Sequence, residues 1–161
     1  MGTELQSGST ILTIWSKEKN KLFSPSSDFS LDQIDAARQL NLHINMYKVM
    51  LAANGVGLAA PQIGMNKRFC VIAADNRILF LFNPRITLRE GERTIEEGCL
   101  SIPGQYGRVK RSERVHVEAL DEFSKSVIIE VDYRSTPLLA QALEHEIDHL
   151  DGKLYTSRLV S

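Results

Sequence analysis

Apolar residues recur every three or four positions near the C-terminus, and this spacing predicts an amphipathic helix that packs against a core. These residues are Leu139, Leu143, Ile147 and Leu150. Thr136 can cap the start of this helix, Pro137 suits its first position, and Gly152 suits the position just past its end. Because Leu138 and Ala142 place apolar side chains on a second face, we expect the helix to be buried nearly all round.

A second helix is predicted in the N-terminal third of the chain. Ser30 and Gln33 have the spacing of a capping box, which marks a helix start. Apolar residues then recur at near-helical spacing as far as about Ala53, and Gly55 is expected to end the helix. We therefore expect one long helix from the capping box to Ala53.

Short runs rich in Val, Ile, Phe and Leu predict strands. Asp75 and Asn76 are the expected turn between two of them, and Asn83-Pro84 is expected to end the second. Residues 86–95 are expected to form a further strand pair or an irregular ladder, and residues 121–125 to join a hairpin. The predicted strands are residues 11–15, 68–73, 78–82, 114–120 and 126–133.

Two segments rich in small residues, glycine and proline interrupt this pattern. Residues 55–62, GVGLAAPQ, suit a tight turn and a close approach of the backbone to another group. They do not fit a nucleotide-binding loop, since they contain neither a G-x-G-x-x-G pattern nor a lysine. Residues 97–104, EGCLSIPG, are expected to form a loop.

Composition is typical of an ordinary globular protein. The 161 residues are expected to form one domain, residues 1–161, and 43% of them are hydrophobic. A formal net charge of −1 gives no reason to expect binding to nucleic acid or to an anionic membrane. No apolar run predicts a membrane span, and residues 1–19 show no secretory signal. With two cysteines, Cys70 and Cys99, we expect no disulfide scaffold.

The C-terminal helix also carries the pattern H-E-x-x-H, formed by His145, Glu146 and His149. Residues four positions apart on a helix project from one face, so both imidazoles can bind one metal ion. Glu146 then lies close enough to move a proton beside that ion. The pattern arises by chance on the order of once per hundred chains of this composition. Two such histidines can also be ordinary core or surface residues, and the pattern does not separate a protease from another metal hydrolase.

Cys99 is the best candidate for a third ligand, because a cysteine in a glycine-flanked loop can orient its thiolate toward a cation. A catalytic cysteine–histidine pair and an inert buried thiol are the alternatives. Against the pair, the helix offers two histidines at ligand spacing and a glutamate. Cys70 lies in the middle of a predicted strand and is expected in the core.

Other polar residues have plainer interpretations. Gln62 is the residue of the 55–62 segment whose side chain both donates and accepts hydrogen bonds, and by itself it is expected to cap the local backbone. His43 and His116 are expected to be exposed. A solvated strand edge is the expected place of the basic residues Arg108, Lys110, Arg111 and Arg114.

Taken together, the segments GVGLAAPQ, EGCLS and QALEHEIDH resemble the motifs of the peptide deformylase family. That family removes the formyl group from N-formylmethionine at the start of nascent polypeptides. The resemblance covers about Gly55–Gly152 and implies a metallo-hydrolase that acts on a linear amide and releases formate. It implies that Cys99, His145 and His149 bind one divalent ion, with Fe²⁺ as the native metal and Zn²⁺, Ni²⁺ or Co²⁺ as substitutes.

The expected fold is α+β, with mixed, mainly antiparallel sheets around the central metal-bearing helix and the second long helix packed outside. The resemblance also implies that Glu146 takes a proton from water and passes it to the departing amine. It assigns stabilisation of the developing oxyanion to the Gln62 side chain and the backbone N–H of Leu100, beside the metal.

Val56, Gly57 and Glu97 are the substrate-binding residues that the resemblance implies. Gly57 would let an extended peptide pair with the backbone, and Val56 would line the pocket for the methionine side chain. Glu97 and Asp148, which are not themselves ligands, would also help to orient the metal-binding residues.

The expected partner is a formyl-methionyl nascent peptide, and the expected location is the cytoplasm, with an organelle or a virus-infected cell as alternatives. The chain ends at Ser161, twelve residues after His149. Contact with the ribosome is therefore expected to proceed without the further C-terminal helix that many bacterial members carry.

Two other functions compete with this one. A zincin-type protease usually has its third ligand downstream of H-E-x-x-H, where only Asp151 follows within reach. A catalytically inactive relative that binds N-terminal peptides or a partner would commonly lack Glu146, Gln62 or Cys99, and all three are present.

Overall fold

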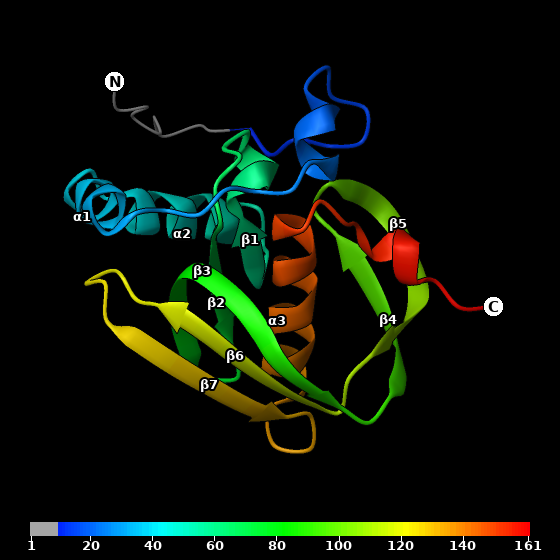
Figure 1. The fold of residues 1–161 in the computed structure, drawn as a ribbon. Coiled ribbons are helices and arrows are strands. Elements are labelled where there is room, and N and C mark those ends of the chain that lie inside the picture. Colours follow the sequence, from blue (N-terminus) through cyan, green and yellow to red (C-terminus); the bar gives the residue numbers. More distant parts are fainter. Residues whose placement is uncertain (1–9) are drawn as a thin grey trace.

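One helix lies at the centre of the fold. The computed structural model describes residues 10–161, in which α3 (Pro137–Leu150) lies between a larger and a smaller β-sheet (Figure 1). The sheets are antiparallel throughout. This arrangement confirms the predicted α+β fold around a central helix. The prediction about a secretory signal concerns residues 1–19, of which residues 1–9 lie outside the described part.

The larger sheet has the strand order β1-β2-β3-β6-β7. Successive side chains of a strand point to opposite faces of the sheet. In the second strand of this order, Cys70 and Ile72 face the core that α3 completes, whereas Phe69 and Val71 face the opposite side. Its centre is therefore covered on both faces, which explains the unbroken apolar run in β2. The strands are β1 (Gly57–Ala59), β2 (Phe69–Ala74), β3 (Arg77–Glu90), β6 (Arg114–Leu120) and β7 (Ser126–Asp132).

The smaller sheet shows that the predicted loop at residues 97–104 is wrong. β4 (Arg93–Cys99) and β5 (Ile102–Arg111) pair as a hairpin, and Cys99 lies opposite Ile102. Gly98 suits this strand because it has no Cβ atom, and the ring of Tyr106 occupies the space that a Cβ atom would need. Pairing with a neighbouring strand thus outweighs the local preference of glycine and proline for loops.

The predicted long helix is two helices, α1 (Leu31–Gln39) and α2 (Leu42–Ala52). The capping box of Ser30 and Gln33 is present at the start of α1. Asn41 breaks the helix because its backbone adopts the left-handed conformation, with φ of 57°, which asparagine tolerates better than most residues. Both helices cover the face of the larger sheet that points away from α3.

Several local predictions are corrected by non-local contacts. Residues 11–15 form no strand; the backbone N–H groups of Leu12 and Ile14 donate instead to Gln62 and Ser101. Asn83-Pro84 does not end β3, which continues through a bulge to pair with β6. Residues 86–95 belong to the end of β3 and the start of β4. Three short 3₁₀ turns complete the described elements: η1 (Lys19–Phe23), η2 (Ala60–Ile63) and η3 (Tyr155–Arg158).

The turn at residues 75–76 and the hairpin of β6 and β7 are confirmed. His43, which we predicted to be exposed, is buried, because its ring packs edge-on against Phe80. Cys70 is fully buried, as predicted. Among residues 10–161, no helix combines the length and apolar character needed to span a membrane.

The apolar stripe of α3 is expected to supply much of the folding free energy. Leu143 is fully buried, whereas Leu138 on the same helix is 38% exposed. Leu143→Ala should destabilise the protein by about 2–5 kcal/mol, because it removes buried methyl groups and leaves a cavity. Leu138→Ala should cost less than about 1 kcal/mol. Urea denaturation of both variants measures the difference, and equal losses would contradict the packing described.

Candidate metal centre

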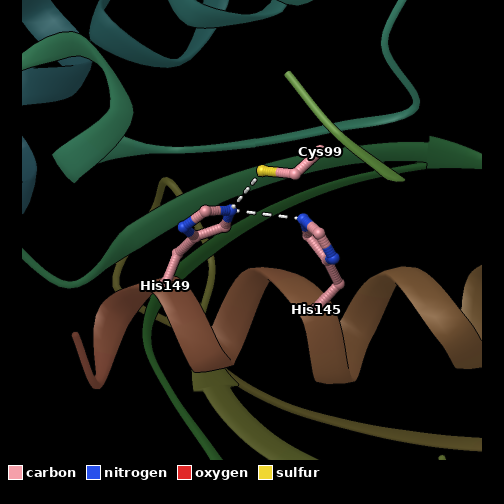
Figure 2. Close-up of side chains that lie close together, drawn as sticks. All are labelled: Cys99, His145 and His149. Atoms are coloured by element: carbon pink, nitrogen blue, oxygen red, sulfur yellow. Dashed lines mark hydrogen bonds between the residues drawn. The ribbon is translucent and has the colours of Figure 1, made fainter. Parts of the chain in front are cut away.

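α3 directs both predicted histidines toward the end of β4, where Cys99 lies (Figure 2). The Nε2 atoms of His145 and His149 are 3.2 Å apart, and Nε2 of His149 lies 3.3 Å from Sγ of Cys99. The Cys99, His145 and His149 donor atoms all lie within 4.8 Å of one another. The helical spacing thus brings the two nitrogen donors to one face of α3, and the end of β4 brings the sulfur beside them.

These three residues fit a metal ion by the chemistry of their donors. Two imidazole nitrogens and a sulfur are donor types that bind transition-metal ions, and here they lie within 4.8 Å of one another. Burial lowers the pKa of His149 well below its usual value, which favours the neutral imidazole that a metal requires. Cys99 and two histidines suit Fe²⁺, Zn²⁺, Co²⁺ and Ni²⁺ better than Mg²⁺ or Ca²⁺, which prefer oxygen ligands.

Glu97 fixes the orientation of His145. Its Oε1 atom lies 2.5 Å from Nδ1 of His145, which leaves Nε2 of that ring facing the other donors. Arg111 holds the same carboxylate, through Nε at 3.0 Å from Oε2 and through Nη2 to Oε1. Burial opposes ionisation of Glu97, but the hydrogen bonds with His145 and Arg111 outweigh it and lower its pKa to about 2.

Arg111 does not lie on a solvated strand edge, as we predicted, but is 2% exposed. It bridges two acidic residues, since Nη1 also donates to Oδ2 of Asp148 at 2.7 Å. A buried guanidinium is stable in this position because both of its neighbours are carboxylates. Strand alternation offered a signal: Arg111 shares a strand face with the apolar residue Val109, which is fully buried.

Glu146 has an environment unlike that of the other buried acids. Its Oε2 atom makes no hydrogen bond with any described residue. Burial raises the pKa of Glu146 to about 7, against the opposing effect of His145. A carboxylate that exchanges protons near neutral pH is suited to act as a general base and acid.

Gly57 in β1 makes room for this glutamate. A Cβ atom at position 57 would lie 2.5 Å from Oε1 of Glu146, so any larger residue would displace the side chain. The close backbone approach expected from the glycine-rich segment is therefore an approach of β1 to Glu146 on α3.

Gln62 lies between the glycine-rich segment and the hairpin. Its Oε1 atom accepts the backbone N–H of Ala59 at 2.9 Å, which is the local capping expected from sequence. Its Nε2 atom donates to Oγ of Ser101 at 3.2 Å and lies 3.8 Å from Sγ of Cys99. The amide is thus held with its N–H group beside the donors.

A cleft of about 700 Å³ opens beside the donors. Glu146, Gln62 and His145 line its polar part. The largest exposed apolar side chains along it are Val56, Tyr106 and Leu138. Such a mixture of apolar walls and few polar groups is typical of a site for a small or extended ligand.

Comparison with known proteins points to one family. The sequence profile described as polypeptide deformylase matches residues 11–161. A peptide deformylase from Heliobacterium modesticaldum is 52% identical over 115 residues, which cover 71% of this chain and 74% of that protein. Peptide deformylase 1 from Bacillus subtilis is 47% identical over 117 residues, covering 71% of each chain.

Solved structures agree with the sequence relatives. A peptide deformylase from Synechococcus elongatus, solved in complex with actinonin, superposes with a TM-score of 0.85 at 34% identity. The match covers 98% of this chain and 81% of that one. The deformylase from Thermotoga maritima superposes with a TM-score of 0.83 at 28% identity, covering 94% of this chain and 97% of that one.

The two cysteines should differ in reactivity. Cys99 is partly exposed beside the cleft, whereas Cys70 is fully buried and burial raises the pKa of its thiol. In metal-free protein, iodoacetamide should modify Cys99 and leave Cys70 intact until the chain unfolds. Added Zn²⁺ should protect Cys99, because a bound thiolate is a poor nucleophile. Peptide mass spectrometry measures both sites, and unchanged labelling of Cys99 with Zn²⁺ would argue against its binding metal.

Proposed function

The chain belongs to the peptide deformylase family, and we propose that Cys99, His145 and His149 hold the metal ion on which its hydrolase activity depends. Members of this family remove the N-terminal formyl group from nascent peptides. The activity is thus that of a metallo-hydrolase on a linear amide. The observation that carries the proposed ligand set is the convergence of one sulfur and two nitrogen donors within 4.8 Å.

Fe²⁺ is the native metal in this proposal, and Zn²⁺, Ni²⁺ or Co²⁺ can replace it. A thiolate and two imidazoles provide a borderline-soft ligand set that accepts all four ions. The bound cation supplies positive charge that acidifies water and polarises a carbonyl group. Glu97 and Arg111 contribute by keeping the ring of His145 in place.

Glu146 is the proposed base. It takes a proton from the attacking water and later donates a proton to the departing amine. Two properties support this role: its Oε2 atom is free of partners among the described residues, and its pKa of about 7 permits both steps near neutral pH. Gly57 leaves the space that the glutamate side chain occupies.

Gln62 and the backbone N–H of Leu100 are the proposed donors to the developing oxyanion. The Gln62 side chain is fixed before substrate arrives, because Ala59 and Ser101 hold its two ends. Leu100 follows Cys99 in the turn between β4 and β5 and lines the cleft. Donors that need no rearrangement during reaction stabilise a transition state most effectively.

The peptide is proposed to bind along β1. This strand is at the edge of the larger sheet, so an extended peptide can add to it through backbone hydrogen bonds. Val56 is 41% exposed and would contact the methionine side chain. Glu97 also lines the cleft, but His145 and Arg111 occupy its oxygens, and we assign it the positioning of His145 rather than contact with substrate.

The family match over residues 11–161 supports treatment of residues 1–161 as one catalytic domain. We place the enzyme where nascent peptides are made, in the cytoplasm, with an organelle or a virus-infected cell as the alternatives. Contact with the ribosome stays a prediction.

Glu146→Gln tests the proposed base. The variant keeps the shape of the side chain but cannot accept the proton from water, so turnover of formyl-Met-Ala-Ser should fall by about 10²–10⁴-fold. Metal content and thermal stability should stay close to those of the original protein. Near-normal turnover at full metal occupancy would refute the assignment. As a control for substrate type, the original protein should leave internal peptide bonds uncut.

Cys99→Ser tests the ligand set. Metal affinity should fall sharply, because a neutral hydroxyl replaces a thiolate ligand. Cys70→Ala is the matched control and should keep its metal, since Cys70 lies in β2 within the core. Elemental analysis of protein purified without oxygen gives the occupancy of each variant and the identity of the native metal. Full occupancy in Cys99→Ser would exclude Cys99 as a ligand.

A further inference from the structure

Arg158 contacts Asp148 of α3 from the C-terminal turn, residues 154–160. It lies at the end of η3, and its Nε and Nη2 atoms donate to the two carboxylate oxygens of Asp148, at 2.5 and 2.8 Å. The side chain of Asp148 is only 3% exposed. This two-pronged contact fixes both residues in one geometry, because a planar guanidinium matches a carboxylate.

Asp148 connects Arg158 with His145. Arg111 donates to Asp148 on one side and to Glu97 on the other, and Glu97 holds Nδ1 of His145. We call these five residues the ion chain. It runs from the C-terminal turn to a proposed metal ligand without a gap.

Charge balance shows what Arg158 adds. Glu97 and Asp148 each carry a negative charge in a buried place, and Arg111 alone supplies one positive charge. Arg158 supplies the second, so two carboxylates face two guanidinium groups. Without it, Asp148 would be a buried charge short of a partner, which is strongly unfavourable. Arg111 would then be drawn toward Asp148 and its hold on Glu97 would weaken.

From this geometry we propose that Arg158 is a positioning residue for the metal centre. By completing the ion chain it keeps Arg111 on Glu97, and so keeps the Nε2 atom of His145 directed at the bound ion. The proposal rests on the metal site proposed above. Arg158 does not line the cleft, so its effect is exerted through the ligand and not through contact with the peptide.

Anchoring of the C-terminal turn is a separate matter, because other contacts already hold it. Leu154 and Tyr155 are buried with Ile102 and Val109. The side chain of Leu159 fills the space above Gly107, and the backbone N–H of Val160 donates to the carbonyl of Arg108. Loss of Arg158 therefore leaves the packing of the turn in place.

The test compares metal release from Co²⁺-loaded protein. Arg158→Ala should release Co²⁺ to a chelator about ten times faster than the original protein, in keeping with the effects of residues that orient metal ligands. The visible absorption bands of bound Co²⁺ should shift, since the geometry of His145 changes. On formyl-Met peptide, kcat should fall while KM stays nearly constant.

Leu159→Ala is the matched control. It loosens the same turn by removing packing on Gly107 but keeps the guanidinium on Asp148. Its thermal stability should fall while Co²⁺ release and the Co²⁺ spectrum stay unchanged. Arg158→Lys keeps the charge but not the two-pronged contact. It should release Co²⁺ more slowly than Arg158→Ala but faster than the original protein. Should Arg158→Ala fail to fold, Arg158→Gln is measured in the same way.

A double-mutant cycle with Asp148→Asn tests the route of the effect. If Arg158 acts through Asp148, Arg158→Ala should change Co²⁺ release little further in the Asp148→Asn background. Any one of three results would overturn the proposal. Arg158→Ala could release Co²⁺ at the original rate, Leu159→Ala could release it as fast as Arg158→Ala, or the effects of Arg158→Ala and Asp148→Asn on release could be fully additive. Cys99→Ser in the same assay reports on the metal site itself, so failure of that site is seen independently of Arg158.

Discussion

The buried, charged helix α3 is the constraint on which the rest of the structure depends. Its middle carries Glu144, His145, Glu146, Asp148 and His149, and none of these is more than 9% exposed. Burying a charge costs several kcal/mol unless a partner compensates it. The sheets and the C-terminal turn that surround α3 therefore have to supply partners as well as apolar packing.

These partners come from β4 and from the end of β5, both remote in sequence from α3. The backbone N–H of Ser112, just past β5, donates to Glu144, and Glu97 in β4 faces His145. Arg111 at the end of β5 neutralises acids on either side of it. Once these pairs are formed, the Oε2 atom of Glu146 is left without a partner among the described residues.

The sequence predicted the parts of this site that depend on local spacing. The H-E-x-x-H pattern fixes one face of α3, and the apolar stripe of the same helix predicts its burial. Gln62 was assigned a local capping bond, which exists, but its second bond to Ser101 links two segments and has no local signature. Arg111 was misjudged because the sequence around it reads as basic and exposed, while its carboxylate partners lie far away in sequence.

By itself, the sequence determined the helix, the types of residue at its centre and the family to which the chain belongs, because helical periodicity and motif spacing are properties of neighbouring positions. Tertiary structure alone decided that residues 97–104 form a hairpin, that Asn41 divides a helix, and that Arg111 is buried between two acids. These outcomes depend on strand pairing and charge compensation between distant segments, whose free energy exceeds local preference.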